Sequence, residues 1–164
     1  MLLPPTWIIT TKSTPTPSML KYQIEESVFI ASSIAESCSM SVTKTNVQRL
    51  LKDFEVEWWF APIDSISDIG SAELITNLLI LQRQAAFESR VTPSEVINAS
   101  IDVTDGSLVF TFDTPLKGST RRTLGRAFYR NKSLYVLWIS SLSNIVDGQY
   151  GGTLKQIQNS FKLI

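Results

Sequence analysis

The segment that most constrains the fold is the end of the chain, from Arg121 to Ile164. It begins with two runs rich in β-branched and aromatic residues, 121–130 and 134–139, joined by a short polar link. This pattern predicts a β-hairpin. The closing segment Thr153–Phe161 predicts a helix with an apolar face formed by Leu154, Ile157 and Phe161. A helix that follows directly on a hairpin can fold back over its apolar face, and we expect this contact to form the core.

The first half of the chain predicts short strands. Residues 7–11 are expected to form a short edge strand or an extended anchor, and three strands are expected at 20–24, 28–31 and 38–43. The links between the later strands are too short for crossovers, so the pairing should be antiparallel. Asn46 could cap a short helical turn over Val47–Leu51. The aromatic stretch Glu55–Phe60 is interpreted as an edge strand or an extended loop, with its aromatic residues in the core rather than in an exposed docking patch.

The middle of the chain predicts the longest helix and a meander of strands. Ser71 is a good N-cap for a helix that ends near Gln84 or Ala85. Asp105-Gly106 is the strongest hairpin signal and separates strands expected at 96–103 and 108–113. A wider turn is expected at 115–118. Together these elements predict an α+β fold, a sandwich built around one antiparallel sheet. We expect one domain over 1–164, with residues 1–18 as an extended Pro/Thr-rich segment that packs on it.

Composition excludes several kinds of site. The chain has 164 residues and no histidine, which removes Ser-His-Asp and Cys-His catalysis and most transition-metal sites. A formal net charge of +0 argues against attraction of the whole domain to nucleic acid. Cys38 is the only cysteine, so no internal disulfide can form. No apolar run reaches the roughly 20 residues that span a bilayer. The first residues do not form a signal peptide, so we expect no targeting peptide in this sequence.

Basic residues gather on the first strand of the terminal hairpin and in its turn. They are Arg121, Arg122, Arg126, Arg130 and Lys132. Strand alternation places Arg122, Arg126 and Arg130 on one face. One interpretation is a solvated face whose side-chain stems cover apolar surface. The other is a docking site for acidic groups of a partner, to which exposed Trp58 and Trp59 could contribute.

Two acidic pairs are weak candidates for metal binding. Asp64 and Asp68 precede the long helix and could bind calcium, but they lack the EF-hand pattern and its closing glutamate. A structural role in a turn is the alternative interpretation. Asp102 and Asp105 bracket the predicted tight turn, which favours aspartate in any case. We therefore expect no bound metal and no directly bound cofactor.

Several short segments, in order along the chain, resemble the PsbP-domain family of extrinsic thylakoid-lumen proteins. Pro5-Thr6-Trp7 is similar to the family's early Pro-x-x-Trp, and Ile66–Glu73 to its Ile-x-Asp-Phe-Gly-Ser-Pro-Glu turn before the first long helix. Arg122–Leu137 resembles its late hairpin and Ser160-Phe161 its terminal Ser-Phe. The resemblance covers nearly the whole chain and implies an α-β-α sandwich on a central antiparallel sheet.

The resemblance also implies a function. It indicates a non-enzymatic lumenal subunit, peripheral to the membrane, that docks on lumenal loops of photosystem II or I and stabilises or shields them. In PsbP itself the role is retention of calcium and chloride at the water-oxidising site, which here would be an indirect link. We expect no counterpart of the long basic N-terminal arm tied to that role, and Asp147–Tyr150 stands in place of the family's Arg-Trp pair. The alternatives are a transient photosystem assembly factor of the same fold and, more remotely, a metal-dependent enzyme.

Overall fold

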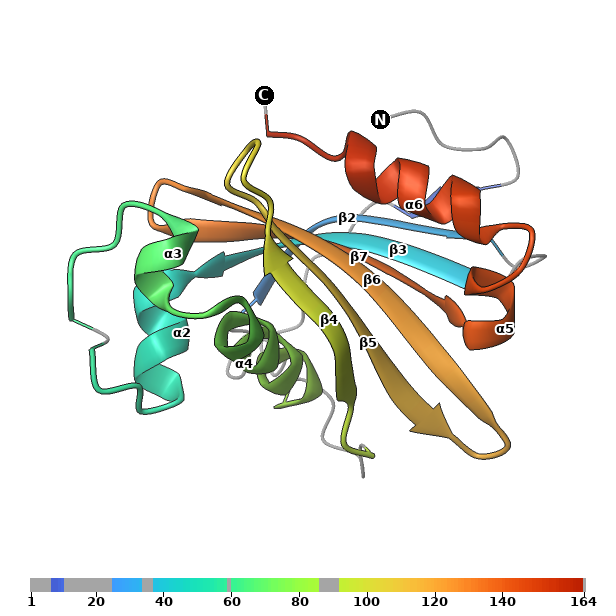
Figure 1. The fold of residues 1–164 in the computed structure, drawn as a ribbon, viewed down its shortest axis with the longest axis horizontal. Helices are drawn as coiled ribbons and strands as arrows, with labels where there is room; N and C mark the ends of the chain where they lie inside the picture. The colour runs from blue at the N-terminus through green and yellow to red at the C-terminus, as the bar shows by residue number, and fades with distance from the viewer. Residues whose placement is uncertain (1–6, 11–24, 34–36, 59, 86–91, 164) are drawn as a thin grey trace.

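A computed structural model of the chain describes residues 7–10, 25–33, 37–58, 60–85 and 92–163. Its centre is a seven-stranded sheet in the order β1-β2-β3-β7-β6-β5-β4, and every pair of neighbouring strands is antiparallel. Helices cover both faces of this sheet (Figure 1). The predicted α-β-α sandwich with a central antiparallel sheet is therefore confirmed.

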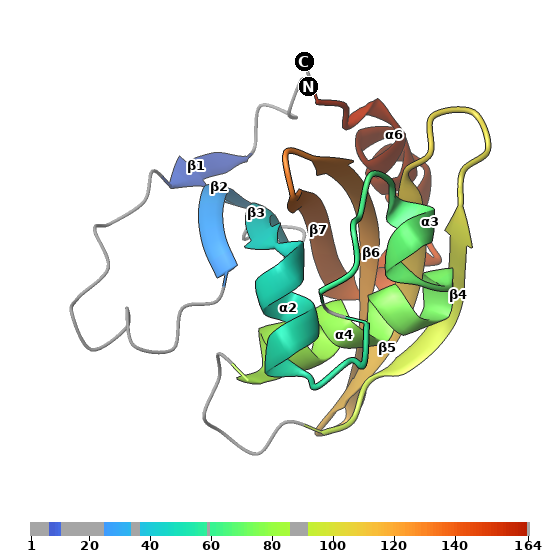
Figure 2. The ribbon, with the colours of Figure 1, turned by 90° about the vertical axis from the view of Figure 1, so that its left-hand side faces the viewer.

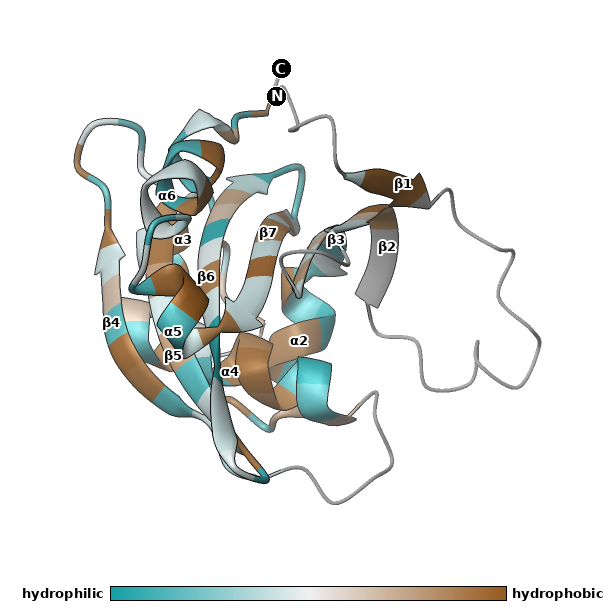
Figure 3. Ribbon diagram, turned by 90° about the vertical axis from the view of Figure 1, so that its right-hand side faces the viewer, coloured by the Kyte–Doolittle hydropathy of each residue, from teal (hydrophilic) through white to brown (hydrophobic). Residues whose placement is uncertain are grey.

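The N-terminal strands form one side of the sheet. They are β1 (Ile8–Thr10), β2 (Glu25–Ser33) and β3 (Cys38–Asn46). β1 lies at the edge, as the sequence predicted, and pairs with β2. It is almost entirely apolar (Figure 3), and both of its isoleucines are 57% exposed. The strand expected at 20–24 falls outside the described residues.

The C-terminal strands form the other side as a meander. They are β4 (Glu95–Ile101), β5 (Leu108–Leu116), β6 (Ser119–Arg130) and β7 (Ser133–Leu142). The hairpin between β4 and β5 is confirmed, and Gly106 in its loop has a φ of +69°. The strand expected to reach Val103 ends at Ile101, however, and residues 102–107 form a wider loop than the predicted tight turn. The turn expected at 115–118 was placed too wide, because pairing continues to Leu116 opposite Ser119. Only Lys117 and Gly118 form the turn.

The two halves of the chain meet in the middle of the sheet, where β3 pairs with β7. The pairing is fixed from Ser39 opposite Ser140 to Asn46 opposite Ser133. The indole Nε1 of Trp138 donates a buried hydrogen bond of 2.8 Å to Thr43 Oγ1, between residues 95 positions apart. The last strand of the chain therefore joins its first half to its second half.

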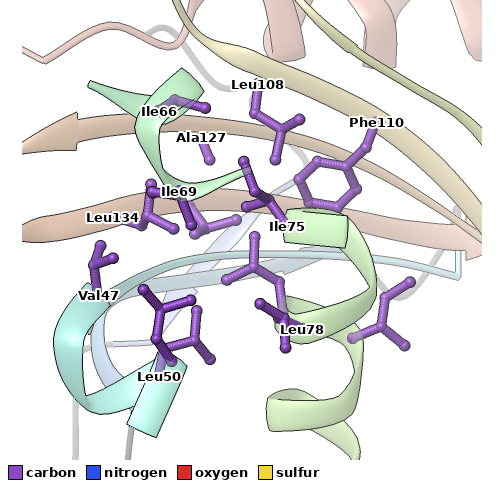
Figure 4. Close-up of a cluster of buried hydrophobic side chains, with 14 of the residues drawn as sticks. Val47, Leu50, Ile66, Ile69, Ile75, Leu78, Leu108, Phe110, Ala127 and Leu134 are labelled. Carbon is purple, nitrogen blue, oxygen red and sulfur yellow. The ribbon is translucent and has the colours of Figure 1, made fainter. Parts of the chain in front are cut away.

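In the described part of the chain, three helices cover one face of the sheet (Figure 2): α2 (Val47–Asp53), α3 (Ile66–Ile69) and α4 (Ala72–Ala85). Their apolar side chains and those of the strands form one core cluster (Figure 4). The predicted caps are confirmed, because Asn46 Oδ1 accepts from Arg49 N at 3.0 Å and Ser71 Oγ from Leu74 N at 3.2 Å. Trp138 packs edge to face on Phe110, with ring centroids 5.4 Å apart.

The opposite face is covered by α5 (Ser143–Val146) and α6 (Gly151–Ser160). Leu154, Ile157 and Phe161 are buried against the sheet, as their spacing predicted. The expectation that this contact forms the whole core was wrong, because helices pack on both faces and give two apolar clusters. Gly151 is the first residue of α6. A Cβ at this position would lie 1.9 Å from the carbonyl oxygen of Val146, so there is no room for a side chain.

In the described residues of the aromatic stretch, 55–58 and 60, the expected edge strand is absent, and Trp58 and Phe60 lie at the surface rather than in the core. The described residues form turns between α2 and α3, and Phe60 is 70% exposed. Trp58 is 41% exposed, and its indole Nε1 donates to Ile69 O at 3.1 Å. Among the described residues of the stretch, Val56 packs against the core. Pro62 cannot donate a ladder hydrogen bond, which disfavours strand pairing at the end of this segment. Trp59 lies outside the described residues.

Candidate functional site

β6 carries four of the five basic residues that the sequence singled out, and its alternation is as expected. Lys132 lies in the turn that follows β6. Leu124 and Phe128 point from one face of the strand into the apolar cluster beneath α6. Arg122 and Arg126 share that face. This face is covered by α5, α6 and the β4–β5 hairpin, so it is not an open solvated surface.

Arg122 lies between two carboxylates. Its Nε and Nη2 each donate a 2.8 Å hydrogen bond to the Asp113 carboxylate, which is directly opposite on β5. Its Nη1 reaches Asp147 Oδ1, at the end of α5. The bidentate bond with Asp113 raises the pKa of Arg122 above its ordinary value, against an opposing effect of burial, so the guanidinium stays charged. Arg122 thus links β5, β6 and α5.

Arg126 is buried to a greater extent, with 5% of its surface exposed. Its Nη2 donates to Asp102 at 3.1 Å and to Asp105 at 2.7 Å, both in the β4–β5 hairpin. Its Nε donates to Ser107 Oγ at 3.0 Å, and its Nη1 reaches Asn159 on α6 at 3.4 Å. The position between the two carboxylates, where a cation would sit, is therefore occupied by a guanidinium group.

Burial of the Asp105 carboxyl raises its pKa, and this effect is outweighed by four others. The Ser107 hydroxyl and backbone amide both donate to Asp105, and Arg126 acts on it through its charge and through a hydrogen bond. The net result is that the pKa of Asp105 falls below its ordinary value. The carboxylate is held in its charged form by contacts within the fold.

These internal ion pairs bear on the predicted docking set. Arg122 and Arg126 form ion pairs with carboxylates of the same chain, whereas Arg121, Arg130 and Lys132 are exposed. Sequence reasoning missed the partners of the two arginines. For Arg122 the sequence contained a signal for its partner, because a two-residue turn at Lys117-Gly118 places Asp113 directly opposite Arg122.

Part of the predicted docking set comes together at one end of the molecule. The β6–β7 turn carries Lys132, and it lies beside the segment between α2 and α3 (Figure 1). The Tyr129 hydroxyl donates to Ile63 O, which holds this segment against the hairpin. A shallow pocket of about 190 Å³ separates them, and its lining includes Pro62, Asp64 and Lys132.

Four exposed residues lie on the two segments that line this pocket: Trp58 and Phe60 on the segment between α2 and α3, and Arg130 and Lys132 on the β6–β7 hairpin. We call these four residues the aromatic-basic end. The same segment also carries the exposed acids Glu55, Glu57 and Asp64, so the surface has mixed charge. Arg121 lies at the other end of β6, on the rim of a second pocket beside the end of α4. The five basic residues therefore do not form a single patch.

The acidic pair before the long helix has a structural role. Asp68 Oδ2 accepts hydrogen bonds from Ser65 N at 2.8 Å, Ser65 Oγ at 2.9 Å and Asp64 N at 3.1 Å. The Ser65 hydroxyl bond, followed by the two backbone bonds, lowers the pKa of Asp68. These bonds close the turn that begins α3. Within the described ranges, no group of three or more cysteine or acidic side chains is arranged to hold a metal ion.

Comparisons with known proteins agree with the fold. No protein-family model and no curated protein sequence matches this chain. Among solved structures, the chain is similar to cyanobacterial PsbP (CyanoP) from Synechocystis sp. PCC 6803, with a TM-score of 0.64 and 15% identity over 99% of this chain and 84% of that one. A looser likeness links it to a protein of unknown function, PA94 from Pseudomonas aeruginosa, with a TM-score of 0.48 and 8% identity over 77% of this chain and 73% of that one. The chain therefore has a PsbP-like fold.

Proposed function

We propose that this protein is a non-enzymatic extrinsic subunit that docks on the lumenal side of a photosystem and stabilises or shields it. The observation that carries the proposal is the likeness to cyanobacterial PsbP, which extends over 99% of the chain. None of the helices in the described part of the chain has the length and apolar composition needed to cross a bilayer. The protein would then be peripheral on the thylakoid membrane and would meet the photosystem through its lumenal loops.

The aromatic-basic end is the surface that we assign to docking. Exposed aromatic and arginine side chains are enriched in the centres of protein interfaces. Phe60 is 70% exposed and Trp58 is 41% exposed. Arg130 and Lys132 can pair with carboxylates on lumenal loops. Arg122 and Arg126 stabilise the fold in this proposal and make no contact with the photosystem.

Copurification with isolated thylakoid membranes tests this assignment. Phe60→Ser should lower the amount retained on the membranes, because it removes a large exposed aromatic side chain. Leu81→Ser is the matched control, since Leu81 on α4 is also an exposed apolar residue at 47% and lies away from this end. Thermal melts of both variants should stay close to wild type.

Charge reversal tests the basic part of the same surface. Arg130→Glu combined with Lys132→Glu should release the protein from membranes at lower salt than wild type. Lys117→Glu is the control, because Lys117 is exposed at the opposite hairpin turn. If all variants are retained like wild type, the aromatic-basic end is not the docking surface. If the wild type is absent from every photosystem fraction, the photosystem assignment itself fails.

The alternative is a transient photosystem assembly factor of the same fold. Quantification of the protein against photosystem reaction centres separates the two. A subunit should copurify at about one copy per photosystem, as a stable interface of standard size requires. An assembly factor should be found far below that ratio and in fractions that contain incomplete complexes.

A further inference from the structure

A pocket at the end of α4 has no role in the docking proposal. It lies on the face of the sheet that carries α2, α3 and α4, and its volume is about 180 Å³. Its walls come from the last turns of α4, from β5, β6 and β7, and from the residue that precedes β4. It is open to solvent at the rim that carries Arg121.

Paired hydroxyl groups line the polar side of this pocket. Thr123 and Ser140 are buried, and their hydroxyl oxygens lie 2.9 Å apart. A second pair, Ser94 and Thr114, is 2.7 Å apart, and Ser94 also accepts from Gln84 Nε2 at 3.0 Å. Within each pair only one hydroxyl donates to the other, so the second hydroxyl keeps a hydrogen to donate elsewhere. The pocket therefore offers O–H donors to a bound group.

Two guanidinium groups add positive charge to the lining. Arg83 lies over the Trp138 ring, with its guanidinium carbon 4.7 Å from the ring centroid, which orients the side chain along the sheet. Arg121 is exposed and, in the part of the chain that the structure describes, forms no ion pair. None of the described lining residues is acidic. Positive charge and hydrogen-bond donors together favour an anion, and the planar guanidinium fork matches a carboxylate.

The rest of the lining is apolar and sets the size of the ligand. Ile80 and Phe112 are buried and form the hydrophobic side. A cavity of about 150 Å³ is large enough for benzene, and this pocket is slightly larger. We propose that it binds a small carboxylate that carries an apolar group about the size of a phenyl ring. The carboxylate meets Arg121 and the hydroxyl groups, and the apolar group lies against Ile80 and Phe112.

Benzoate is the probe that tests the site, and benzamide is the control because it has nearly the same shape without the charge. Titration into ¹⁵N-labelled full-length protein should shift the amide signals of Thr114, Arg121 and Thr123 with saturation. A ligand of this size should bind with a Kd of about 1 mM. Benzamide should bind about tenfold more weakly, because it cannot form charge-assisted bonds.

A pair of matched variants identifies the residues that bind. Arg121→Gln should weaken benzoate binding about fivefold or more and leave benzamide binding nearly unchanged. Arg130→Gln makes the same chemical change on the same strand outside the pocket, and it should bind benzoate like wild type. Equal affinity for benzoate and benzamide overturns the proposal. So does the absence of saturable shifts at about ten times the expected Kd, or shifts that map outside the pocket. None of these results depends on whether the protein docks on a photosystem.

Discussion

Replacing Arg126 by methionine tests whether this residue stabilises the fold through internal ion pairs or contacts a partner at a docking surface. Methionine keeps an unbranched apolar stem in the space beside Phe128 but removes the guanidinium group. The variant loses the ion pairs with Asp102 and Asp105 and the hydrogen bond to Ser107. It therefore releases the β4–β5 hairpin from its attachment to β6.

The size of the effect follows from the exposure of the groups. Breaking a fully buried ion pair costs about 3–5 kcal/mol. Here the arginine side chain is 6% exposed but its two partners are 31% and 30% exposed, so water can rehydrate the carboxylates once the arginine is gone. We therefore expect the variant to lose about 2–3 kcal/mol of unfolding free energy. For a chain of this length that corresponds to a fall in Tm of about 5–10 °C.

Urea unfolding monitored by circular dichroism measures this loss. Arg121→Met is the control, because Arg121 is exposed and should change the unfolding free energy by less than about 0.5 kcal/mol. A double-mutant cycle with Asp105→Asn should give a coupling energy of about 1 kcal/mol or more between Arg126 and Asp105. An Arg126→Met variant as stable as wild type that is nevertheless lost from membranes would refute our account and return Arg126 to the docking surface.

Two further predictions concern packing and acid stability. Gly125→Ala should lower the free energy of unfolding by about 1–3 kcal/mol, because the new Cβ would lie 2.0 Å from the Phe110 ring. Gly152→Ala on α6 should instead raise it by about 0.5–1 kcal/mol, because its new Cβ meets nothing within 4 Å. Urea unfolding measures both changes, and equal effects would contradict the packing around Gly125. Because the pKa of Asp105 is lower in the folded state, its contribution is fully present above the unfolded pKa of about 3.9 and is lost as the pH falls through the folded value. Unfolding free energy measured from pH 7 to pH 2 should therefore fall less steeply in acid for Asp105→Asn than for wild type, and parallel curves would show that the carboxylate is not stabilised by the fold.

Local signals in the sequence predicted most of the elements. Asn46 and Ser71 cap helices as their residue types suggested, and Gly106 lies in the loop of the hairpin that it predicted, although this loop is wider than a two-residue turn. These features depend on hydrogen bonds between residues three or four positions apart, or on the backbone freedom of one glycine. Residues close to each feature in the sequence determine it, so a single sequence is sufficient to predict these features.

The pairing of distant elements could not be predicted in the same way. The residues of β3 and β7 do not specify that these two strands pair, because any strand of similar length with the same alternation of apolar and polar residues could take either place. The aromatic stretch near Phe60 was placed in the core because its residues are apolar, but the fold gives it no sheet partner. The ion pairs of Arg126 depend on a hairpin loop that folds over the strand, which strand alternation does not reveal.

The pairing of β3 with β7 has a consequence for biosynthesis. When the ribosome has made the first half of the chain, β3 has only β2 beside it, and the strand that completes its hydrogen bonds is about 90 residues away. Most of the protein must therefore be synthesised before the sheet can close, and the exposed strand edges invite aggregation until then. We expect nascent chains that end before Ser133 to depend on chaperones, and chains released with the last strand intact to become resistant to proteases in a single step.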